Sequence, residues 1–255
     1  MVGDGAEIKW SEVFENNPRI SKKIIPDGVW VKTVKGNRPY IDYSKTTKDR
    51  MAWKPFKAEP GEIYFAPGEL RWSESDFVYI EPNTKGSFGG NKDWGFDNWQ
   101  RVVDSLPEIR WIQGKGRRLR NVRQLETRSF RDACALLARA FLFVGTDGGM
   151  HHAAAALGKP AVVVWGGLVG PKTLGYDTHT NLCKATWFCG SILPCLHCRQ
   201  SLDLITPDMV VEAIEKRTRI LPSGSRRTPT ALREGSGLDV SGAQALKSFA
   251  ACRKV

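Results

Sequence analysis

From residue 77 onwards, the apolar residues fall into short runs that predict the strands of a parallel sheet. Each run is rich in Val, Ile or aromatic residues, and turn-forming residues such as Asn, Pro and Gly follow the runs. Because polar and apolar residues do not alternate within the runs, we expect strands that are covered on both faces. The predicted strands span residues 77–80, 109–112, 141–144 and 161–165, with a shorter one at 122–125.

Segments with helical spacing or helical composition lie between these runs. Residues 96–106 place apolar side chains on one side of a helix, and Ser129 is a suitable N-cap for a helix over residues 130–140. An Ala-rich helix is expected over residues 151–157, and Pro207 favours the start of another helix. Strands that alternate with helices predict an α/β fold with a Rossmann-like, doubly wound parallel sheet.

The ends of the predicted strands indicate where a ligand would bind. In a doubly wound sheet, the ligand lies in a crevice at the carboxyl ends of the strands. Asn83, Gly114, Asp147 and Gly166 mark these ends. We therefore expect these four residues to lie along one crevice.

The turn at residues 146–149, Thr-Asp-Gly-Gly, joins a predicted strand to a predicted helix. Glycine allows another group to approach the backbone closely, and the free N–H groups at a helix N-terminus suit a phosphate. Lys92, in the loop after the first of these strands, is placed to reach a diphosphate at this turn. The alternatives are an ordinary glycine turn, an exposed loop lysine, and packed or capping side chains at His151 and His152.

Residues 147–160 resemble the D-[ST]-G-x-x-H-x-A-x-A-L-G-x-P segment of the heptosyltransferase-like glycosyltransferases, glycosyltransferase family 9. Gly148 departs from the pattern, because the family usually has Ser or Thr there, and this loses one hydroxyl donor to a phosphate. Lys92 and Trp94 match the family's Lys-x-Trp segment. The matching residues of the first segment are Asp147, Gly149, His152, Ala154, Ala156, Leu157, Gly158 and Pro160.

The resemblance covers residues 77 to about 216 and implies a GT-B-type donor domain. It implies transfer of a sugar, often a heptose, from a nucleotide-diphosphate donor to an acceptor hydroxyl, with inversion and without a catalytic metal. Asp4, after Gly3, matches the position of the family's general base, although it is also explained as a turn residue without a role. The expected donor-binding residues are Lys92, Gly114, Asp147, Gly148, Gly149 and His152.

The chain divides into three expected parts. Residues 1–75 are a reduced N-terminal, acceptor-side region of loops and short strands packed by aromatic residues, with a short helix near residues 7–14 and a strand at 62–65. Residues 76–221 are the Rossmann-like, nucleotide-sugar-binding domain. Residues 222–255 are a basic tail that is expected to be mobile.

The formal net charge of +11 is high and fits either an anionic partner or a solvated basic surface. Sugar transfer to a polyanion such as DNA is therefore one alternative function. A second is a non-catalytic module that binds nucleotide sugars, because residues 1–75 are short for the family's acceptor domain. The acidic, polar N-terminus predicts no signal peptide, no apolar run is long enough for a membrane span, and the expected location is cytoplasmic.

Four of the cysteines, Cys183, Cys189, Cys195 and Cys198, lie close together in the sequence. Cys195 and Cys198 have the spacing of half a zinc site, and His197 lies between them, but a second half at the usual spacing is absent. A structural zinc or iron bound by these cysteines is one interpretation. Free buried thiols and a disulfide formed on lysis are the others.

Overall fold

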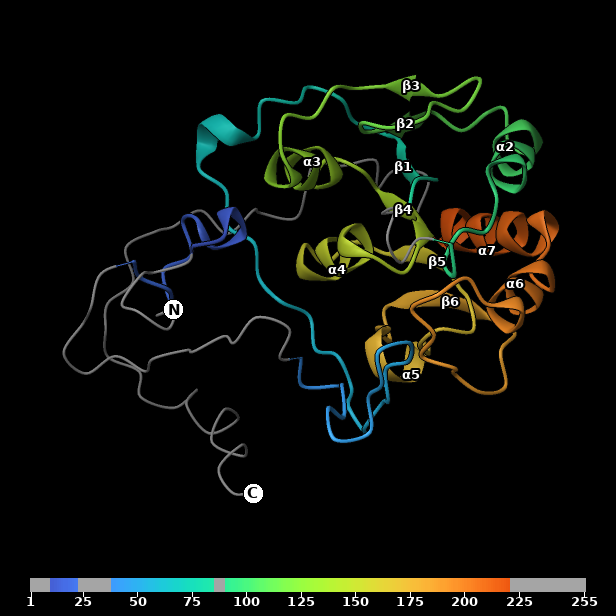
Figure 1. Cartoon of the computed structure of the whole chain (residues 1–255). Coiled ribbons are helices and arrows are strands. Elements are labelled where there is room, and N and C mark those ends of the chain that lie inside the picture. The colour runs from blue at the N-terminus through green and yellow to red at the C-terminus, as the bar shows by residue number, and fades with distance from the viewer. Residues whose placement is uncertain (1–9, 23–37, 85–89, 221–255) are drawn as a thin grey trace.

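In the computed structural model, which describes residues 10–22, 38–84 and 90–220, a six-stranded sheet separates two layers of helices (Figure 1). All neighbouring strands are parallel, in the order β3-β2-β1-β4-β5-β6. This is the order of a doubly wound Rossmann-like sheet. The strands are β1 (Val78–Glu81), β2 (Trp111–Gln113), β3 (Arg123–Gln124), β4 (Leu142–Thr146), β5 (Ala161–Trp165) and β6 (His179–Cys183).

Helices cover both faces of the sheet. In Figure 1, α3 and α4 lie on one side of the sheet, and α2 and α7 lie on the other. None of the described helices has the length and apolar character needed to cross a membrane. The helices are α2 (Phe96–Ser105), α3 (Phe130–Leu137), α4 (Gly149–Ala156), α5 (Pro171–Leu174), α6 (Leu196–Asp203) and α7 (Pro207–Ile220), with short 3-10 turns at Glu12–Phe14 and Pro67–Glu69.

Consecutive residues of β1 pack into different cores, which explains the unbroken apolar runs of the sequence. Tyr79 contributes to the core beneath α3 and α4, whereas Val78 and Ile80 contribute to the core beneath α2 and α7. Side chains of a strand alternate between the two faces of a sheet, so a strand that is buried on both faces must be apolar at every position.

Most of the predicted elements are confirmed. The β5 strand has the predicted bounds, and α2 buries Trp99, Val102 and Val103 as its periodicity indicated. The Ser129 hydroxyl accepts a hydrogen bond from the Asp132 amide at 3.2 Å, as expected for an N-cap.

Other elements differ from the sequence prediction. Residues 62–65 form no strand, and β6, α5 and α6 were not predicted. β6 is an edge strand that begins with the polar residues His179, Thr180 and Asn181, and four of its five residues are half-buried, so its sequence lacks the apolar run that marks the central strands.

The described part of the N-terminal region contributes no strand to the sheet. Tyr40, Trp53 and Phe56 pack against the core beneath α3 and α4, which agrees with the expected packing by aromatic residues. Of the helix expected at residues 7–14, only the 3-10 turn Glu12–Phe14 falls within the described residues. The predicted tail, residues 222–255, lies outside them.

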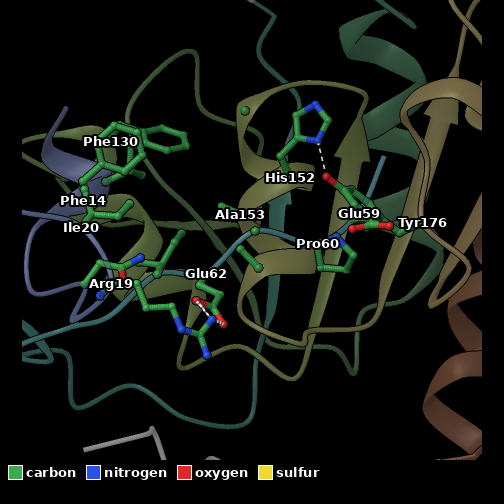
Figure 2. Close-up of a pocket in the computed structure, with 16 residues that line it drawn as sticks. Phe14, Arg19, Ile20, Glu59, Pro60, Glu62, Phe130, His152, Ala153 and Tyr176 are labelled. Carbon is green, nitrogen blue, oxygen red and sulfur yellow. Dashed lines mark hydrogen bonds and ion pairs between the residues drawn. The ribbon is translucent and has the colours of Figure 1, made fainter. Parts of the chain in front are cut away.

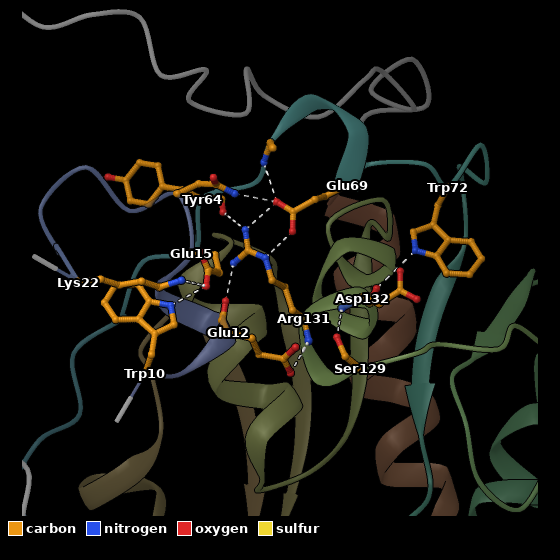
Figure 3. A network of polar contacts seen from close by, with 12 residues as sticks. Trp10, Glu12, Glu15, Lys22, Tyr64, Glu69, Trp72, Ser129, Arg131 and Asp132 are labelled. Carbon is orange, nitrogen blue, oxygen red and sulfur yellow. Dashed lines mark hydrogen bonds and ion pairs between the residues drawn. The ribbon is translucent and has the colours of Figure 1, made fainter. Parts of the chain in front are cut away.

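A buried arginine joins the N-terminal region to α3 (Figure 3). The Arg131 guanidinium donates hydrogen bonds to the Glu69 carboxylate at 2.5 and 2.8 Å, to the Glu12 carbonyl oxygen at 2.9 Å and to the Tyr64 carbonyl oxygen. The guanidinium presents several donors in one plane, so a single side chain satisfies acceptors from separate segments. Arg131 therefore fixes two stretches of irregular chain against the helical layer.

Candidate functional site

The strand order identifies the part of the sheet edge where a ligand would bind. The direction of winding reverses between β1 and β4, which are hydrogen-bonded neighbours in register from Val78 and Leu142. In doubly wound folds the ligand crevice lies outside the carboxyl ends of the strands at this reversal. The segments that leave these two strands contain Lys92 and Asp147, respectively.

The structure brings Lys92 and Asp147 together. The Lys92 ammonium donates a hydrogen bond to the Asp147 carboxylate and forms an ion pair with it. The Asp147 side chain is 3% exposed and that of Lys92 is 22% exposed. A buried carboxylate requires a partner, so Asp147 anchors the lysine, and an ammonium has three donors, of which this contact uses one. Lys92 is thus a cation held at the reversal point, and its contact with Asp147 leaves two ammonium donors for a ligand.

The turn after β4 is held by His151. The Gly148 amide donates a hydrogen bond to His151 Nδ1 at 2.8 Å, and His151 Nε2 contacts the Leu174 carbonyl oxygen at 3.1 Å. Because a carbonyl oxygen can only accept, Nε2 carries the proton and the ring is neutral. Burial lowers the pKa of His151 well below its usual value, which favours this neutral form. The Gly148 amide, predicted to face a phosphate, is therefore already engaged within the protein.

The two glycines of the turn have different surroundings. A Cβ atom added at Gly149 would lie 3.0 Å from the Phe130 ring, whereas one added at Gly148 would meet nothing within 4 Å. Gly148 has an extended backbone, with φ 177°, that any residue can adopt. A side chain at Gly149 would therefore crowd the Phe130 ring, while Gly148 has room for a side chain.

A cavity of about 860 Å³ extends from this turn along α4 (Figure 2). The turn and α4 contribute Gly149 and His152 to its lining, and the N-terminal region forms the opposite wall. The wall contains apolar residues such as Phe14 and Ile20. The polar lining residues are Asn17, Arg19, Glu59, Glu62, His152 and Tyr176, and Arg19 pairs with Glu62 at 2.7 Å.

His152 faces this cavity with a defined partner. Its Nδ1 lies 2.7 Å from the Tyr176 hydroxyl, as Figure 2 shows. Burial lowers the pKa of His152. The smaller effects of its neighbours oppose each other, because Asp147 raises this pKa and Lys92 lowers it. The predicted residue therefore lies at the turn as a neutral hydrogen-bonding group.

Two other predicted residues have different outcomes. Gly114 follows β2, where an added Cβ would lie 2.5 Å from the Tyr79 hydroxyl, so close packing explains glycine there. Asp4, the predicted general base, lies outside the described residues.

Glu81 is a polar residue of the site that sequence reasoning missed. It ends β1 at the reversal point, and burial raises the pKa of its carboxyl group to about 7 against an opposing hydrogen bond from Asn83. A desolvated carboxyl group at a ligand edge is a candidate functional group. Its signal in the sequence was an acidic residue at the end of an apolar run.

The cysteine cluster consists of Cys189, Cys195, His197 and Cys198, whose ligand atoms lie within 4.8 Å of one another. Cys195 is the N-cap of α6, so three members come from the start of one helix. Burial raises the pKa of Cys195, but hydrogen bonds from the Cys198 amide and the Cys189 thiol outweigh it and lower that pKa below its usual value. Cys183, at the end of β6, is not part of the group, and His197 stands in its place.

The geometry of this cluster fits a tetrahedral metal. The Cys189 sulfur lies 3.3 Å from that of Cys198 and 3.8 Å from that of Cys195. Sulfur ligands at about 2.3 Å from a tetrahedral metal are separated by about 3.8 Å. His197 Nδ1 is buried and has no hydrogen-bond partner among the described residues, which a role as metal ligand or an adjacent bound group would explain. The cysteines of the described residues form no disulfide.

Comparison with known proteins agrees with this fold. The iron-containing dodecameric glycosyltransferase TibC of enterotoxigenic E. coli H10407 has a TM-score of 0.52 at 17% identity, covering 68% of this chain and 50% of that one. E. coli ADP-heptose LPS heptosyltransferase II has a TM-score of 0.50 at 20% identity, covering 62% and 54%. The chain therefore spans about half the length of these two structures. No curated protein sequence matches it.

The family comparison covers the second half of the sheet domain. Residues 118–204 match the family described as glycosyltransferase family 9 (heptosyltransferase). This segment contains the turn at Asp147, the helix α4 and the cysteine cluster. Residues 118–204 are therefore similar in sequence to glycosyltransferase family 9, and the chain shares its fold with the heptosyltransferase II structure.

Proposed function

We propose that this chain binds a nucleotide-diphosphate sugar at the β1–β4 reversal and transfers the sugar to an acceptor hydroxyl. The observation that carries the proposal is the Lys92–Asp147 pair beside the N-terminus of α4. It places a fixed cation and a helix dipole at the edge where doubly wound folds bind ligands. The family match at residues 118–204 supports sugar transfer as the reaction.

The proposed chemistry is a displacement in which the diphosphate leaves the anomeric carbon as the acceptor oxygen bonds to it. The growing negative charge on the diphosphate requires stabilisation, which Lys92 and the turn at Gly149 supply electrostatically. We propose that the reaction inverts the anomeric carbon, needs no catalytic metal, and uses Asp4 as the base that removes the acceptor proton. An ADP-linked heptose is the first donor to test, because the matching family is described as heptosyltransferases.

The acceptor is proposed to enter the cavity between the N-terminal region and α4. This cavity begins at Gly149 and has walls from both parts of the chain. On this basis residues 1–75 form the acceptor side and residues 76–221 the donor domain. The cytoplasmic location remains a prediction.

Calorimetry with ADP, UDP and GDP, and with their sugars, tests the donor site. Lys92→Gln keeps a donor for the buried Asp147 but removes the charge, so affinity should fall about tenfold to a hundredfold. The matched control is Lys57→Gln, because Lys57 also pairs with an aspartate, Asp177, but on the surface. Equal affinity of Lys92→Gln and the parent for every nucleotide would show that the diphosphate binds elsewhere.

A second function, a binding module without transferase activity, is favoured by one observation. The described part of residues 1–75 has no sheet of its own and few regular elements. Donor hydrolysis or transfer by the purified chain distinguishes the two functions. Binding without turnover would favour the module, whereas turnover that is lost in Asp4→Asn would favour the transferase.

We propose a structural zinc or iron at Cys189, Cys195, His197 and Cys198. A metal there would cross-link the start of α6 to the segment that contains Cys189, a structural role separate from sugar transfer. Replacing Cys195 and Cys198 together with serine should release the metal and lower the melting temperature. Elemental analysis of protein purified without added metal provides the measurement, and a metal-free protein with freely titratable thiols would contradict the proposal.

A further inference from the structure

We propose that Asn91 is a positioning residue that couples the cysteine cluster to Lys92. Occupancy of the cluster would then change the affinity of the donor site. The expected change in nucleotide affinity rests on the proposed function. A second measurement, chemical labelling of Lys92, tests the position of Lys92 without a nucleotide. The two sites lie in segments far apart in the sequence, and Asn91 is in contact with one and adjacent to the other.

The Asn91 side chain is committed to the segment between Cys189 and Cys195. Its Nδ2 donates hydrogen bonds to the carbonyl oxygens of Ser191 and Leu193, both at 2.7 Å. Its Oδ1 accepts a hydrogen bond from the Cys195 amide at 2.9 Å. Asn91 is 4% exposed, so water cannot readily replace these partners. The loop of the cysteine cluster therefore determines where Asn91 lies.

The residues that follow Lys92 are held by the same part of the chain. The Asp93 carbonyl oxygen accepts a hydrogen bond from Arg199 of α6 at 2.9 Å, and Trp94 Nε1 donates to the Ile205 carbonyl oxygen at 2.8 Å. Lys92 is thus flanked on both sides by residues that contact the 191–205 segment. The backbone of Lys92 has to follow any movement of that segment.

A neighbouring loop restricts the movement of Asn91 further. A Cβ added at Gly166, after β5, would lie 2.6 Å from the Asn91 carbonyl oxygen. The Asn91 backbone is therefore packed against one loop while its side chain is held by another. With so little free space, a displacement of the 191–195 segment is expected to move Asn91 rather than be absorbed by it.

The ends of this segment are held in different ways. Around Cys189, backbone hydrogen bonds tie Cys189 to Gly167 at 2.8 Å and Met51 to Gly190 at 2.8 Å. At the other end, Cys195 is held by Asn91 and by the cluster itself. A metal would fix this second end relative to the first. Its removal should therefore loosen the end that contacts Asn91.

Coupling of this kind is reciprocal at equilibrium. If metal binding strengthens nucleotide binding by a given factor, nucleotide binding strengthens metal binding by the same factor. Coupling factors between sites are commonly about fivefold to a hundredfold. We expect chelation of the metal and Asn91→Ala to weaken ADP binding by a factor in this range.

The experiment compares Asn91→Ala with Asn98→Ala in the full chain. Asn98 Nδ2 donates to the Trp94 carbonyl oxygen at 2.7 Å, so the control also removes a side-chain hydrogen bond near Lys92 but spares the cysteine loop. Acetic anhydride labelling of Lys92, measured by mass spectrometry against Lys57 as internal reference, reports whether the pair with Asp147 is intact. Calorimetry with ADP and elemental analysis complete the measurements.

We expect Asn91→Ala, and chelation of the parent, to raise Lys92 labelling about fivefold or more, and we expect Asn98→Ala to leave it near the parent rate. In a Lys92→Gln background, Asn91→Ala should weaken ADP binding no further, because Asn91 acts through Lys92. A residue with a merely structural role would lower the melting temperature in both backgrounds and weaken binding additively.

Each contrary result has a distinct meaning. Unchanged Lys92 labelling in a folded Asn91→Ala variant would overturn the positioning role, and additive losses of ADP affinity would overturn action through Lys92. A protein that takes up neither zinc nor iron would overturn coupling to a metal. A parent chain that binds no nucleotide would refute the proposed function instead, and labelling would still decide the role of Asn91. If Asn91→Ala does not fold, Asn91→Asp is used instead. It places a carboxylate oxygen against the carbonyl oxygens of Ser191 and Leu193 and so removes the same two hydrogen bonds.

Discussion

The sheet domain and the N-terminal region are stabilised in contrasting ways. The sheet is buried on both faces by apolar side chains, and its strands and helices were readable from local sequence patterns. The N-terminal region has few regular elements and is held by aromatic contacts and by Arg131, whose partners are distant in sequence. Apolar periodicity thus specifies one part of the molecule, and individual polar contacts specify the other. The cavity lies between them, so its shape depends on the less regular partner.

The sheet domain should unfold as one unit when its core is disrupted. Trp99 is fully buried, and its ring meets that of Trp94 edge to face with centroids 4.5 Å apart. Trp99→Ala should lower the free energy of unfolding by about 3–5 kcal/mol. Urea denaturation followed by circular dichroism measures this loss. Loss of structure in the N-terminal region alone, with the sheet domain as stable as in the parent, would contradict this contrast between the two regions.

The N-terminal region should detach while the sheet survives. Arg131→Met removes the donors to Glu69, Glu12 and Tyr64, and it should weaken the attachment of that region by about 3–5 kcal/mol, the usual cost of removing one partner of a buried ion pair. Limited chymotrypsin digestion should then cut first within residues 10–75. Arg71→Met is the control, because Arg71 pairs with Asp132 at 2.7 Å in a more exposed position. Equal rates of digestion of the two variants would show that Arg131 holds the N-terminal region no more firmly than Arg71 does.

The two regions should respond to pH in opposite directions. Burial raises the pKa of Glu81 in the sheet to about 7. The folded protein therefore holds this proton more tightly than the unfolded chain, and its stability falls as pH rises from about 5 to about 8, by on the order of 1–3 kcal/mol. Urea denaturation across this range should show the decline in the parent. Glu81→Gln should flatten it, and an unchanged slope would assign the effect to another group.

In the N-terminal region, hydrogen bonds from Arg131 lower the pKa of Glu69 despite its partial burial. The stabilisation that Glu69 provides is therefore present above its unfolded pKa of about 4.3 and is lost as pH falls through the lower folded value. Digestion of the N-terminal region by an acid-active protease should accelerate in that acidic range, before the sheet unfolds. Acceleration at alkaline pH instead would contradict this sign.

The smallest expected effect is a gain at the turn. Gly148→Ser introduces a hydroxyl into open space on an extended backbone, so stability should change by less than about 0.5 kcal/mol. One additional hydrogen bond to a diphosphate would tighten ADP binding about twofold to tenfold. Calorimetry measures the change, and Gly149→Ser, which crowds the Phe130 ring, is the control. Weaker binding by Gly148→Ser would show that the diphosphate does not approach this position.

The extent to which the sequence predicted this structure follows from the range of the interactions involved. The bounds of β5 and the N-cap at Ser129 depend on neighbouring residues and were predicted. The proximity of Lys92 and Asp147 followed from a rule of topology, because both lie after strands at the same edge. A packed or capping His151 was one of the alternatives from the sequence, but its hydrogen bond with the Gly148 amide could not be specified, since it depends on how one ring packs beneath the turn.

The cysteine cluster shows the limit of spacing as a guide. Cys195 and Cys198 were grouped correctly because they lie in one helical turn. Cys183 was grouped with them by proximity in sequence, but it ends β6, away from the cluster. The elevated pKa of Glu81 was also inaccessible, because desolvation depends on the packing of distant segments around one carboxyl group.

The ring of His151 has a thermodynamic consequence for any anion that binds at the turn. It bridges the Gly148 amide and the Leu174 carbonyl oxygen, so the backbone after β4 is already ordered before a ligand arrives. Association then loses little protein entropy at this point, and most of the entropic cost falls on the ligand. The turn should behave as a preorganised anion-binding site. Its affinity for an anion should depend more on the rigidity of the ligand than on conformational change in the protein.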